Sequence, residues 1–244
     1  MNPLFNEGPL IIDSVRHGKW VVPTVEEADA VMKSNSDNAV RPVGTFAGNI
    51  NATLSELMAA DRSIVLGGQL IRYGFAGLTT GLYEKYPERF ITYSVSEELM
   101  NSSAMGLALA GKRVLMFHVR LDFLLCGMNA LFNHIPIWAK KGHKLPITFI
   151  CQEGRGVNSG QGAQHSKDPT FFFQRFEGWN VCVPQTPQEA ADMLRVAVMG
   201  DKPTLYVIHR RLFNASEGTR VVIPQEIKLC GASKRHMDAF YHDR

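Results

Sequence analysis

Hydrophobic and polar positions alternate along residues 46–214 in a pattern that predicts helices and strands in turn. Ile50, Leu54, Leu57 and Met58 fall on one face of a helix over 50–60. Short apolar runs typical of buried strands separate such helical segments. We predict strands at 63–66, 90–95, 113–119, 146–151, 180–184 and 204–209, and further helices at 78–85, 97–110, 123–140 and 187–199. This alternation predicts a three-layer α/β fold, a parallel sheet with helices on both faces.

The two ends of the chain have a different pattern. Residues 1–45 predict an N-terminal arm with a short helix over 25–33, where Thr24 and Glu27 form a capping-box pattern. Residues 215–244 are polar and mixed, which is typical of a C-terminal tail. We therefore expect one domain, residues 46–214, between an arm and a tail.

The composition narrows the class of protein. The 244 residues are 45% hydrophobic and 20% charged, as in an ordinary globular protein, and the net charge of +3 comes without the dense basic stripe that binds nucleic acid. The four cysteines lie far apart without a CxxC pair, which disfavours a zinc site or a disulfide scaffold and suits a reducing compartment. No apolar run reaches the roughly 20 residues of a membrane span, and the start lacks a signal sequence. We expect a cytoplasmic protein.

Residues 91–111, ITYSVSEELMNSSAMGLALAG, place an acid where a strand meets a helix of small residues. Two readings remain open. Ser94 and Glu97 can form a capping box that simply starts the helix. Alternatively, Glu97 is a buried acid that lies against a ligand, because the small side chains around it leave room.

Two further segments could carry chemistry. Phe123 opens a helix after a strand, and there an aromatic serves either the core or a cofactor platform. The loop after Glu153 contains four glycines within nine residues, 154–162, and ends in Gln164-His165-Ser166. Such a loop either approaches a ligand or is a flexible surface loop, and its polar ending favours a site. Phosphate-loop, serine-hydrolase and metal-ligand motifs are absent from the sequence, so no metal ligands are predicted.

In order and spacing, these motifs resemble the pyrimidine-binding domain of thiamine-diphosphate enzymes, as in the beta subunits of 2-oxoacid dehydrogenases and the middle domain of transketolases. The resemblance covers about 46–214. The matching segments are VLGG at 65–68 where the family has Leu-Gly-Glu, YGFAGLTTGLYEKYPERF at 73–90, SEE at 96–98, AG at 110–111, LDFLL at 121–125, GAQHS at 162–166 and VCVPQTPQEAADMLRVAV at 181–198.

The resemblance implies roles for particular residues. Glu97 donates to the pyrimidine nitrogen of thiamine diphosphate and favours the imino tautomer that removes the thiazolium proton. Phe123 stacks on the pyrimidine, and His165 faces the substrate as an acid–base group or hydrogen-bond donor. Gly67, Gly68 and Gln69 are implied to contact the cofactor. Because neighbouring helix residues point about 100° apart, Glu97 rather than Glu98 is expected to face the cofactor.

The sequence also departs from the family pattern. Gly68 stands where many members have an acid, and Arg120 stands where transketolases tend to have an aromatic residue. By the resemblance, beta subunits continue with a C-terminal domain, which we expect this chain to lack. The Gly-Asp-Gly…Asn signature that holds Mg²⁺ and the diphosphate is missing as well, since Gly200-Asp201-Lys202 lacks the second glycine. The resemblance therefore implies half of an active site.

The expected function is that of a beta-type subunit in an enzyme that decarboxylates a 2-oxo acid or cleaves a ketose and transfers the acyl-anion equivalent to an acceptor. A carboligase, a transketolase-like enzyme and a 2-oxoacid dehydrogenase component all remain open. The alternative is a catalytically silent interaction subunit that retains the fold.

The expected partner is an alpha-type subunit that binds the diphosphate and Mg²⁺, in an alpha-2-beta-2 heterotetramer. Ser102, Ser103, Ala104 and Gly106 allow the helix after Glu97 to approach another helix closely. That helix then lies at a subunit contact, or these residues pack on the chain's own sheet.

Overall fold

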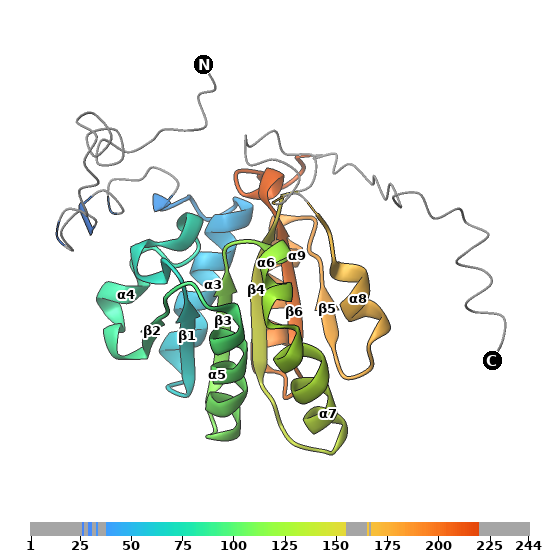
Figure 1. The fold of residues 1–244 in the computed structure, drawn as a ribbon. Coiled ribbons are helices and arrows are strands. Elements are labelled where there is room, and N and C mark those ends of the chain that lie inside the picture. Colours follow the sequence, from blue (N-terminus) through green and yellow to red (C-terminus); the bar gives the residue numbers. More distant parts are fainter. Residues whose placement is uncertain are drawn as a thin grey trace, which may run out of the picture.

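The computed structural model describes Glu26, Asp29, Ala30 and Lys33, and then residues 38–154, 165 and 167–219. These residues contain a six-stranded sheet in the order β2-β1-β3-β4-β6-β5, in which every neighbouring pair is parallel (Figure 1). The strands are β1 (Ile64–Gly68), β2 (Phe90–Thr92), β3 (Arg113–His118), β4 (Ile147–Glu153), β5 (Asn180–Cys182) and β6 (Thr204–His209). The predicted α/β fold is confirmed.

Helices cover the sheet on both faces. Helices α3 (Phe46–Ala60) and α9 (Pro187–Met199) lie behind the sheet in Figure 1, and α5 (Glu97–Leu109), α6 (Leu121–Leu124), α7 (Ile135–Lys140) and α8 (Thr170–Arg175) lie in front. Side chains of a strand point alternately to the two faces. On β3, Leu115 and Phe117 join the core beneath α3 and α9, whereas Val114 and Met116 join the core beneath α5.

Local capping explains why α3 and α9 begin where they do. The Thr45 side chain accepts a hydrogen bond from the Gly48 amide at 3.2 Å, and the Thr186 side chain accepts one from the Glu189 amide at 3.1 Å. Pro187, which follows Thr186, suits the first turn of a helix. The predicted bounds of α9 and β6 are confirmed, while α3 begins earlier than predicted because Thr45 caps it.

Residues 123–140 are helical as predicted, but they do not form one regular helix. The chain instead forms α6, a 3-10 turn η5 (Leu125–Gly127), a π-helical segment η6 (Asn129–His134) and α7. Pro136 explains the wider turns before it, because proline lacks an amide hydrogen and its ring clashes with the carbonyl four residues earlier. Proline is tolerated in the first turn of a helix, and Pro136 lies in the first turn of α7.

Other boundaries also differ from the predictions. The predicted helix over 78–85 is only the short α4 (Leu82–Lys85), preceded by the 3-10 turns η2 (Ile71–Tyr73) and η3 (Phe75–Gly77) and followed by η4 (Pro87–Arg89). Strands β2 and β5 are shorter than predicted, and β1 and β4 extend further, to Gly68 and Glu153. Helix α8 was not predicted, because the run Phe171-Phe172-Phe173 has no helical periodicity. The last described turn is η8 (Arg210–Leu212).

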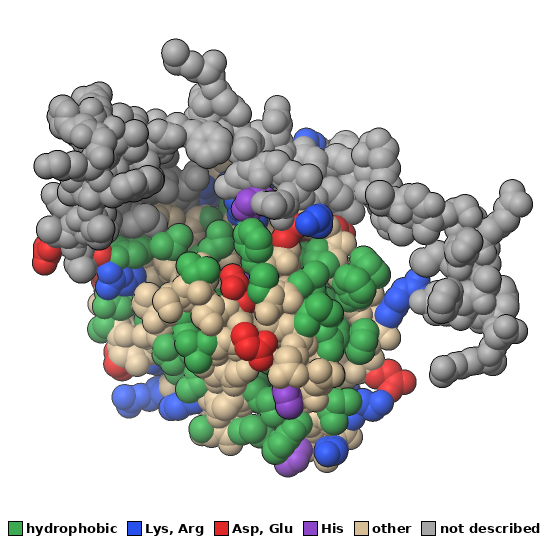
Figure 2. Space-filling view, in the orientation of Figure 1, with side chains coloured by type: hydrophobic (Ala, Val, Ile, Leu, Met, Phe, Trp, Pro, Cys, Tyr) green, Lys and Arg blue, Asp and Glu red, His purple; other side chains and the backbone are tan. Residues whose placement is uncertain are grey.

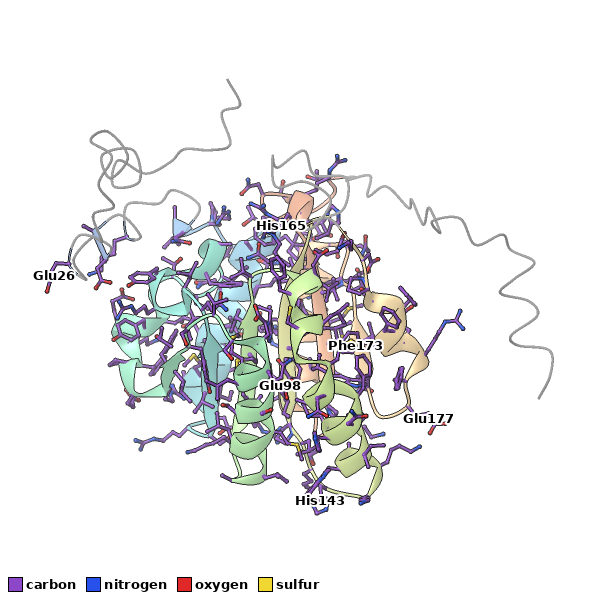
Figure 3. The ribbon with its side chains drawn as sticks, in the orientation of Figure 1. Glu26, Glu98, His143, His165, Phe173 and Glu177 are labelled. Carbon is purple, nitrogen blue, oxygen red and sulfur yellow. The ribbon has the colours of Figure 1, made fainter. Side chains whose placement is uncertain are left out.

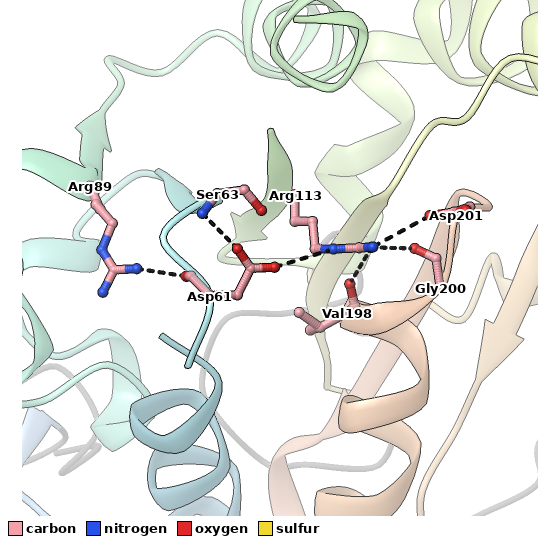
Figure 4. A network of polar contacts seen from close by, with 7 residues as sticks. All are labelled: Asp61, Ser63, Arg89, Arg113, Val198, Gly200 and Asp201. Carbon is pink, nitrogen blue, oxygen red and sulfur yellow. Dashed lines mark hydrogen bonds and ion pairs between the residues drawn. The ribbon is translucent and has the colours of Figure 1, made fainter. Parts of the chain in front are cut away.

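A polar network around Arg113 lies at the amino edge of the sheet (Figure 4). Arg113, the first residue of β3, donates to the Val198 and Gly200 carbonyls at 3.2 and 2.9 Å and forms ion pairs with Asp61 and Asp201, both at 3.4 Å. The Asp61 carboxylate also accepts a hydrogen bond from the Ser63 amide at 2.7 Å. Its pKa is lowered, first by the Ser63 side chain and then by the Ser63 amide and Arg113. The network ties β1 and β3 to the end of α9.

Several predicted features lie outside the described residues, namely most of the arm, the loop residues 155–164 and 166, and the tail beyond 219. Within the predicted helix over 25–33, the four described residues are helical. None of the helices in the described part of the chain combines the length and the apolar character that crossing a membrane requires.

Candidate functional site

Strands β1, β3, β4 and β6 all end at one edge of the sheet because they are parallel. In open α/β sheets, ligands bind outside this carboxyl edge. Figure 3 shows His165 at this edge, above the strands, whereas Glu98 lies lower, on α5. Gly67 and Gly68 end β1, and Gln69 follows them. Glu97 begins α5, Phe123 lies in the short α6 after β3, and His165 follows β4. The parallel topology therefore brings the predicted site residues toward this edge.

Phe123 and His165 are in direct contact. Their ring centroids lie 5.0 Å apart with an interplanar angle of 89°, an edge-to-face arrangement. The Asp122 carboxylate fixes this contact, because its Oδ1 accepts a hydrogen bond from the Lys167 amide at 3.0 Å, two residues after His165. The helix that bears Phe123 and the loop that bears His165 are thereby held together.

Asp122 is a candidate that the sequence motif did not single out. Its Oδ2 is buried and makes no hydrogen bond within the described part of the chain. Burial raises the pKa of this carboxyl, and the Lys167 amide and its own amide partly oppose the shift. A half-buried carboxyl with one unused oxygen, next to an aromatic ring and an imidazole, is a group that can bind a ligand donor. The only signal in the sequence was its place beside Phe123.

Gly154 brings the two ends of the His165 loop together. A Cβ atom at this position would lie 2.7 Å from the His165 carbonyl oxygen. Only glycine therefore allows the end of β4 to pass this close to the backbone of His165. The residues between them are outside the described part, but the loop's anchor points are fixed.

Glu97 is the first residue of α5, and the structure excludes the alternative in which Ser94 and Glu97 form a capping box. The N-cap is Ser96, it makes no side-chain cap bond, and Ser94 lies outside the helix. Glu97 stands four residues before Asn101 and so continues the buried stripe of Asn101, Ala104 and Ala108. Glu97 itself is half-buried, at the start of this stripe.

Glu98 lies on a different side of α5. Its carboxylate accepts a hydrogen bond at 3.3 Å from the hydroxyl of Ser102, an exposed residue one turn later. Both acids are half-buried, and the preference for Glu97 over Glu98 as the group that faces the cofactor stays a prediction.

The three predicted contacts at the end of β1 differ from one another. A Cβ on Gly67 would meet the flexible end of Met116 at 2.8 Å, whereas one on Gly68 would meet the Phe117 carbonyl oxygen at 2.6 Å. Gly68 also has a φ of +150°, which disfavours any other residue. The acid that the family pattern has at this position does not fit this backbone. Gln69 contacts the first turn of α5 through its amide, 3.8 Å from the Met100 sulfur.

The segment after Gln69 is strained. Leu70, Phe75 and Ala76 have φ angles of 59°, 30° and 55°, which non-glycine residues rarely adopt. Such strain persists only where the surroundings fix it, and it clusters at functional sites. Here Asn38 accepts a hydrogen bond from the Ala76 amide at 3.0 Å, and Arg41 donates to the Ala76 carbonyl at 2.7 Å.

Buried polar residues underlie the carboxyl edge. Arg120 donates to the Gln152 side chain at 3.3 Å, and burial, with a smaller contribution from Arg210, lowers its pKa to about 10. Glu153 and His209, paired residues at the ends of β4 and β6, form a buried contact of 3.2 Å. Sequence reasoning missed the Glu153–His209 pair, because strand-end residues of this kind are usually solvated.

The described residues thus bring Phe123, His165 and Asp122 into contact and join Gln69 to the helix of Glu97. No group of three or more His, Cys, Asp or Glu side chains that could hold a metal occurs among the residues that the structure describes.

Comparison with known families decides the identity of this fold. The family described as "Transketolase, pyrimidine binding domain" matches residues 45–216, which contain all six described strands together with Glu97, Phe123 and His165. The chain belongs to this family.

The similar curated proteins include beta subunits of pyruvate dehydrogenase. Residues of this chain are 28% identical over 181 residues to the pyruvate dehydrogenase E1 component subunit beta of Chaetosphaeridium globosum, covering 72% of this chain and 55% of that protein. The chloroplastic subunit beta-2 of Arabidopsis thaliana is 24% identical over 230 residues, covering 91% and 54%. The chain spans about half the length of the curated relatives that it matches.

Solved transketolases share the fold. An inactive beta4 tetramer of a split-gene transketolase has a TM-score of 0.56 at 18% identity, covering 73% of this chain and 53% of that one. The Pichia stipitis transketolase in complex with sedoheptulose-7-phosphate has a TM-score of 0.57 at 16% identity, covering 80% and 31%.

Proposed function

We propose that this chain supplies the pyrimidine-binding half of a thiamine-diphosphate site in an enzyme that decarboxylates a 2-oxo acid or cleaves a ketose and transfers the acyl-anion equivalent to an acceptor. The observation that carries the proposal is the contact between the Phe123 and His165 rings at the carboxyl edge of the sheet. The segment after Phe123 lies against the first turn of α5, which begins at Glu97. The pyruvate dehydrogenase beta subunits among its relatives favour a 2-oxoacid dehydrogenase component.

The residues present fit the pyrimidine half of this cofactor. A pyrimidine ring needs a carboxyl group to hydrogen-bond its ring nitrogen and an aromatic face to lie against. Glu97 provides the carboxyl, and Phe123, which is half-buried, provides the ring. When bound, thiamine diphosphate supplies the carbanion chemistry of the reaction.

The roles of the protein groups follow from their chemistry. In this proposal the Glu97 carboxyl hydrogen-bonds the ring nitrogen of the cofactor and exchanges a proton with it. Phe123 orients the ring. His165 is held edge-on against Phe123 and can donate a hydrogen bond to the substrate or exchange a proton with it.

The other half of the site belongs to a partner in this proposal. We propose an alpha-type subunit that binds the diphosphate and Mg²⁺, in an alpha-2-beta-2 assembly. Figure 2 shows hydrophobic side chains grouped over the front face, and large exposed hydrophobic residues on α5, α7 and α8 include Leu99, Trp138 and Phe171. Patches of this kind mark interaction surfaces. The inactive beta4 tetramer among the similar structures supports the need for a different partner chain.

One observation favours the alternative of a catalytically silent interaction subunit. The backbone at Gly68 cannot accept the acid of the family pattern, so one conventional contact is absent. The presence of Glu97, Phe123 and His165 outweighs this observation, because a subunit without catalytic function is not expected to have all three.

The test uses the chain co-expressed with its alpha-type partner. Glu97→Gln removes the transferable proton with little change in shape, and we expect turnover of a 2-oxo acid or ketose to fall about 10²- to 10⁴-fold with the assembly intact. Glu98→Gln, one residue away at a carboxylate that is hydrogen-bonded to Ser102, is the matched control and is expected to stay near wild type. Equal activity in both variants and wild type would favour the silent subunit.

A further inference from the structure

Helix α5 has a polar residue, Asn101, among the apolar side chains of the core. Asn101 is fully buried between Met100 and Ala104, which belong to the apolar core beneath the helix. Burying an amide is unfavourable unless its donors and acceptor all find partners. The hydrogen-bond partners of the Asn101 side chain therefore decide what this residue contributes.

Asn101 bonds three different groups. Its Nδ2 donates to the carbonyls of Leu124 and Gly127 at 3.4 and 3.3 Å. Its Oδ1 lies 2.9 Å from Nε2 of His118, the last residue of β3. Since the amide hydrogens are used by the two carbonyls, Oδ1 is the acceptor and His118 donates from Nε2.

His118 is suited to remain a neutral donor. It is fully buried, and burial lowers its pKa to about 3. The imidazole therefore stays uncharged at physiological pH, and the hydrogen bond to Asn101 fixes the proton on Nε2.

These bonds connect the two elements that face the cofactor. Asn101 stands one helical turn after Glu97, and Leu124 directly follows Phe123. A Cβ on Gly127 would lie 2.2 Å from the Asn101 Nδ2 and 3.0 Å from the Glu97 carbonyl oxygen, so the segment after Phe123 lies directly against the first turn of α5. One amide thus spans the helix of the acid and the segment of the aromatic ring.

We propose that Asn101, held by His118, is a positioning residue that fixes the Glu97 carboxyl relative to the Phe123 ring. The inference rests on the proposed function, because it assigns a catalytic purpose to a contact between the two cofactor-facing elements. Asn101 touches no reacting atom in this proposal and acts only through its neighbours.

The test must separate positioning from ordinary stability. Asn101→Asp keeps the shape but turns an acceptor oxygen toward two carbonyls. His118→Phe removes the donor, whereas His118→Gln keeps an amide donor at a similar reach. Tyr206→Phe is the matched control, since it deletes another buried hydrogen bond, from the Tyr206 hydroxyl to the Ala190 carbonyl at 2.6 Å, in the core on the opposite face of the sheet.

All variants are measured in the co-expressed complex. We expect Asn101→Asp and His118→Phe to lower turnover at saturating cofactor about 10- to 100-fold and to change the near-ultraviolet circular dichroism of bound thiamine diphosphate, which reports its pyrimidine tautomer. His118→Gln should recover much of the His118→Phe loss. Tyr206→Phe should change melting temperature without changing either signal.

Hydrogen exchange and the comparison of turnover between the variants keep the inference separate from the proposed function. Hydrogen exchange on the chain is expected to rise at residues 97–101 and 121–127 in Asn101→Asp and not in Tyr206→Phe, whatever the cofactor. Wild-type turnover with an unaffected Asn101→Asp variant, or equal losses in Asn101→Asp and Tyr206→Phe at matched stability, would overturn the inference alone. A wild-type complex that binds no thiamine diphosphate would overturn the proposed function and the inference together.

Discussion

At the amino edge of the sheet, the Arg113 guanidinium joins two carboxylates and two helix-end carbonyls, whereas at the carboxyl edge Asp122 keeps a buried oxygen without a partner among the described residues. The amino edge also has ordinary backbone geometry, while three strained residues follow β1 at the carboxyl edge. The first arrangement satisfies every polar group that it gathers. The second has the buried Asp122 oxygen and the strained segment after β1, features that are typical of functional sites.

The first prediction concerns the anchor of the candidate site. Gly154→Ala places a Cβ 2.7 Å from the His165 carbonyl oxygen, so the backbone that carries His165 must shift. We expect turnover of the assembled complex to fall about 10- to 100-fold, because a shift of this backbone moves the imidazole that is proposed to face the substrate. Steady-state kinetics and the melting temperature of the same preparation check it. Wild-type kinetics in this variant would show that His165 does not depend on this close approach.

The opposite edge should respond in stability and not in activity. Arg113→Ala leaves the Val198 and Gly200 carbonyls without this donor and Asp61 without its ion pair. We expect the free energy of unfolding to fall by about 1–3 kcal/mol, with turnover per assembled complex unchanged. Denaturant unfolding and kinetics measure the two quantities. A selective loss of turnover would break the distinction between the edges.

Acid should act on the two edges in different pH ranges. The His118 pKa is lowered from 6.5 to about 3 in the folded chain, so only the unfolded chain takes up this proton as the pH falls below 6.5. Stability contributed by the carboxyl edge is therefore lost between about pH 6.5 and 3, at up to about 1.4 kcal/mol per pH unit. The Asp61 pKa is lowered from 3.8, so the amino edge loses stability only below about that pH.

Urea unfolding of wild type and His118→Phe between about pH 7 and pH 4.5 isolates this contribution. The variant is expected to have a flatter pH dependence, whatever its stability at neutral pH. Parallel curves for the two proteins would contradict the assignment of a neutral buried histidine.

The smallest predicted effect concerns the outer side of α5. Ser102 and Gly106 are exposed and Ala104 is buried, so the small residues serve both of the alternatives left open by the sequence. A Cβ on Gly106 meets nothing within 4 Å, and Gly106→Ala is expected to stabilise the lone chain by about 0.5–1 kcal/mol. If α5 packs closely on a partner, the same change weakens assembly, which light scattering of the co-expressed pair measures. Unchanged assembly would place the contact elsewhere.

The sequence predicted most of the fold, because the elements that decide it have strong local signals. Thr186, Pro187 and the periodic apolar residues of α9 define that helix without help from the rest of the chain. The segment 123–140 departs from one regular helix for the opposite reason: its apolar pattern is helical, but Pro136 forces wider turns that periodicity does not report.

The candidate site was predictable only in part. The family resemblance implied that Glu97, Phe123 and His165 serve one cofactor site, and the structure brings Phe123 and His165 into contact. Asn101 and His118 carried no signal, because a single asparagine in a helix and a histidine in a strand usually face solvent. Their importance arises from packing between α5, β3 and the segment after α6, which is a property of the tertiary structure alone.

The most direct test of the account is calorimetric titration of thiamine diphosphate, with Mg²⁺, into the lone chain and into the complex with its alpha-type partner. The chain supplies half of a site in this account. We therefore expect no measurable binding by the lone chain and one cofactor bound per copy of it in the complex. Tight binding by a monodisperse lone chain, or none by a well-assembled complex, would contradict the claim that the carboxyl edge of this sheet is the pyrimidine half of a shared site.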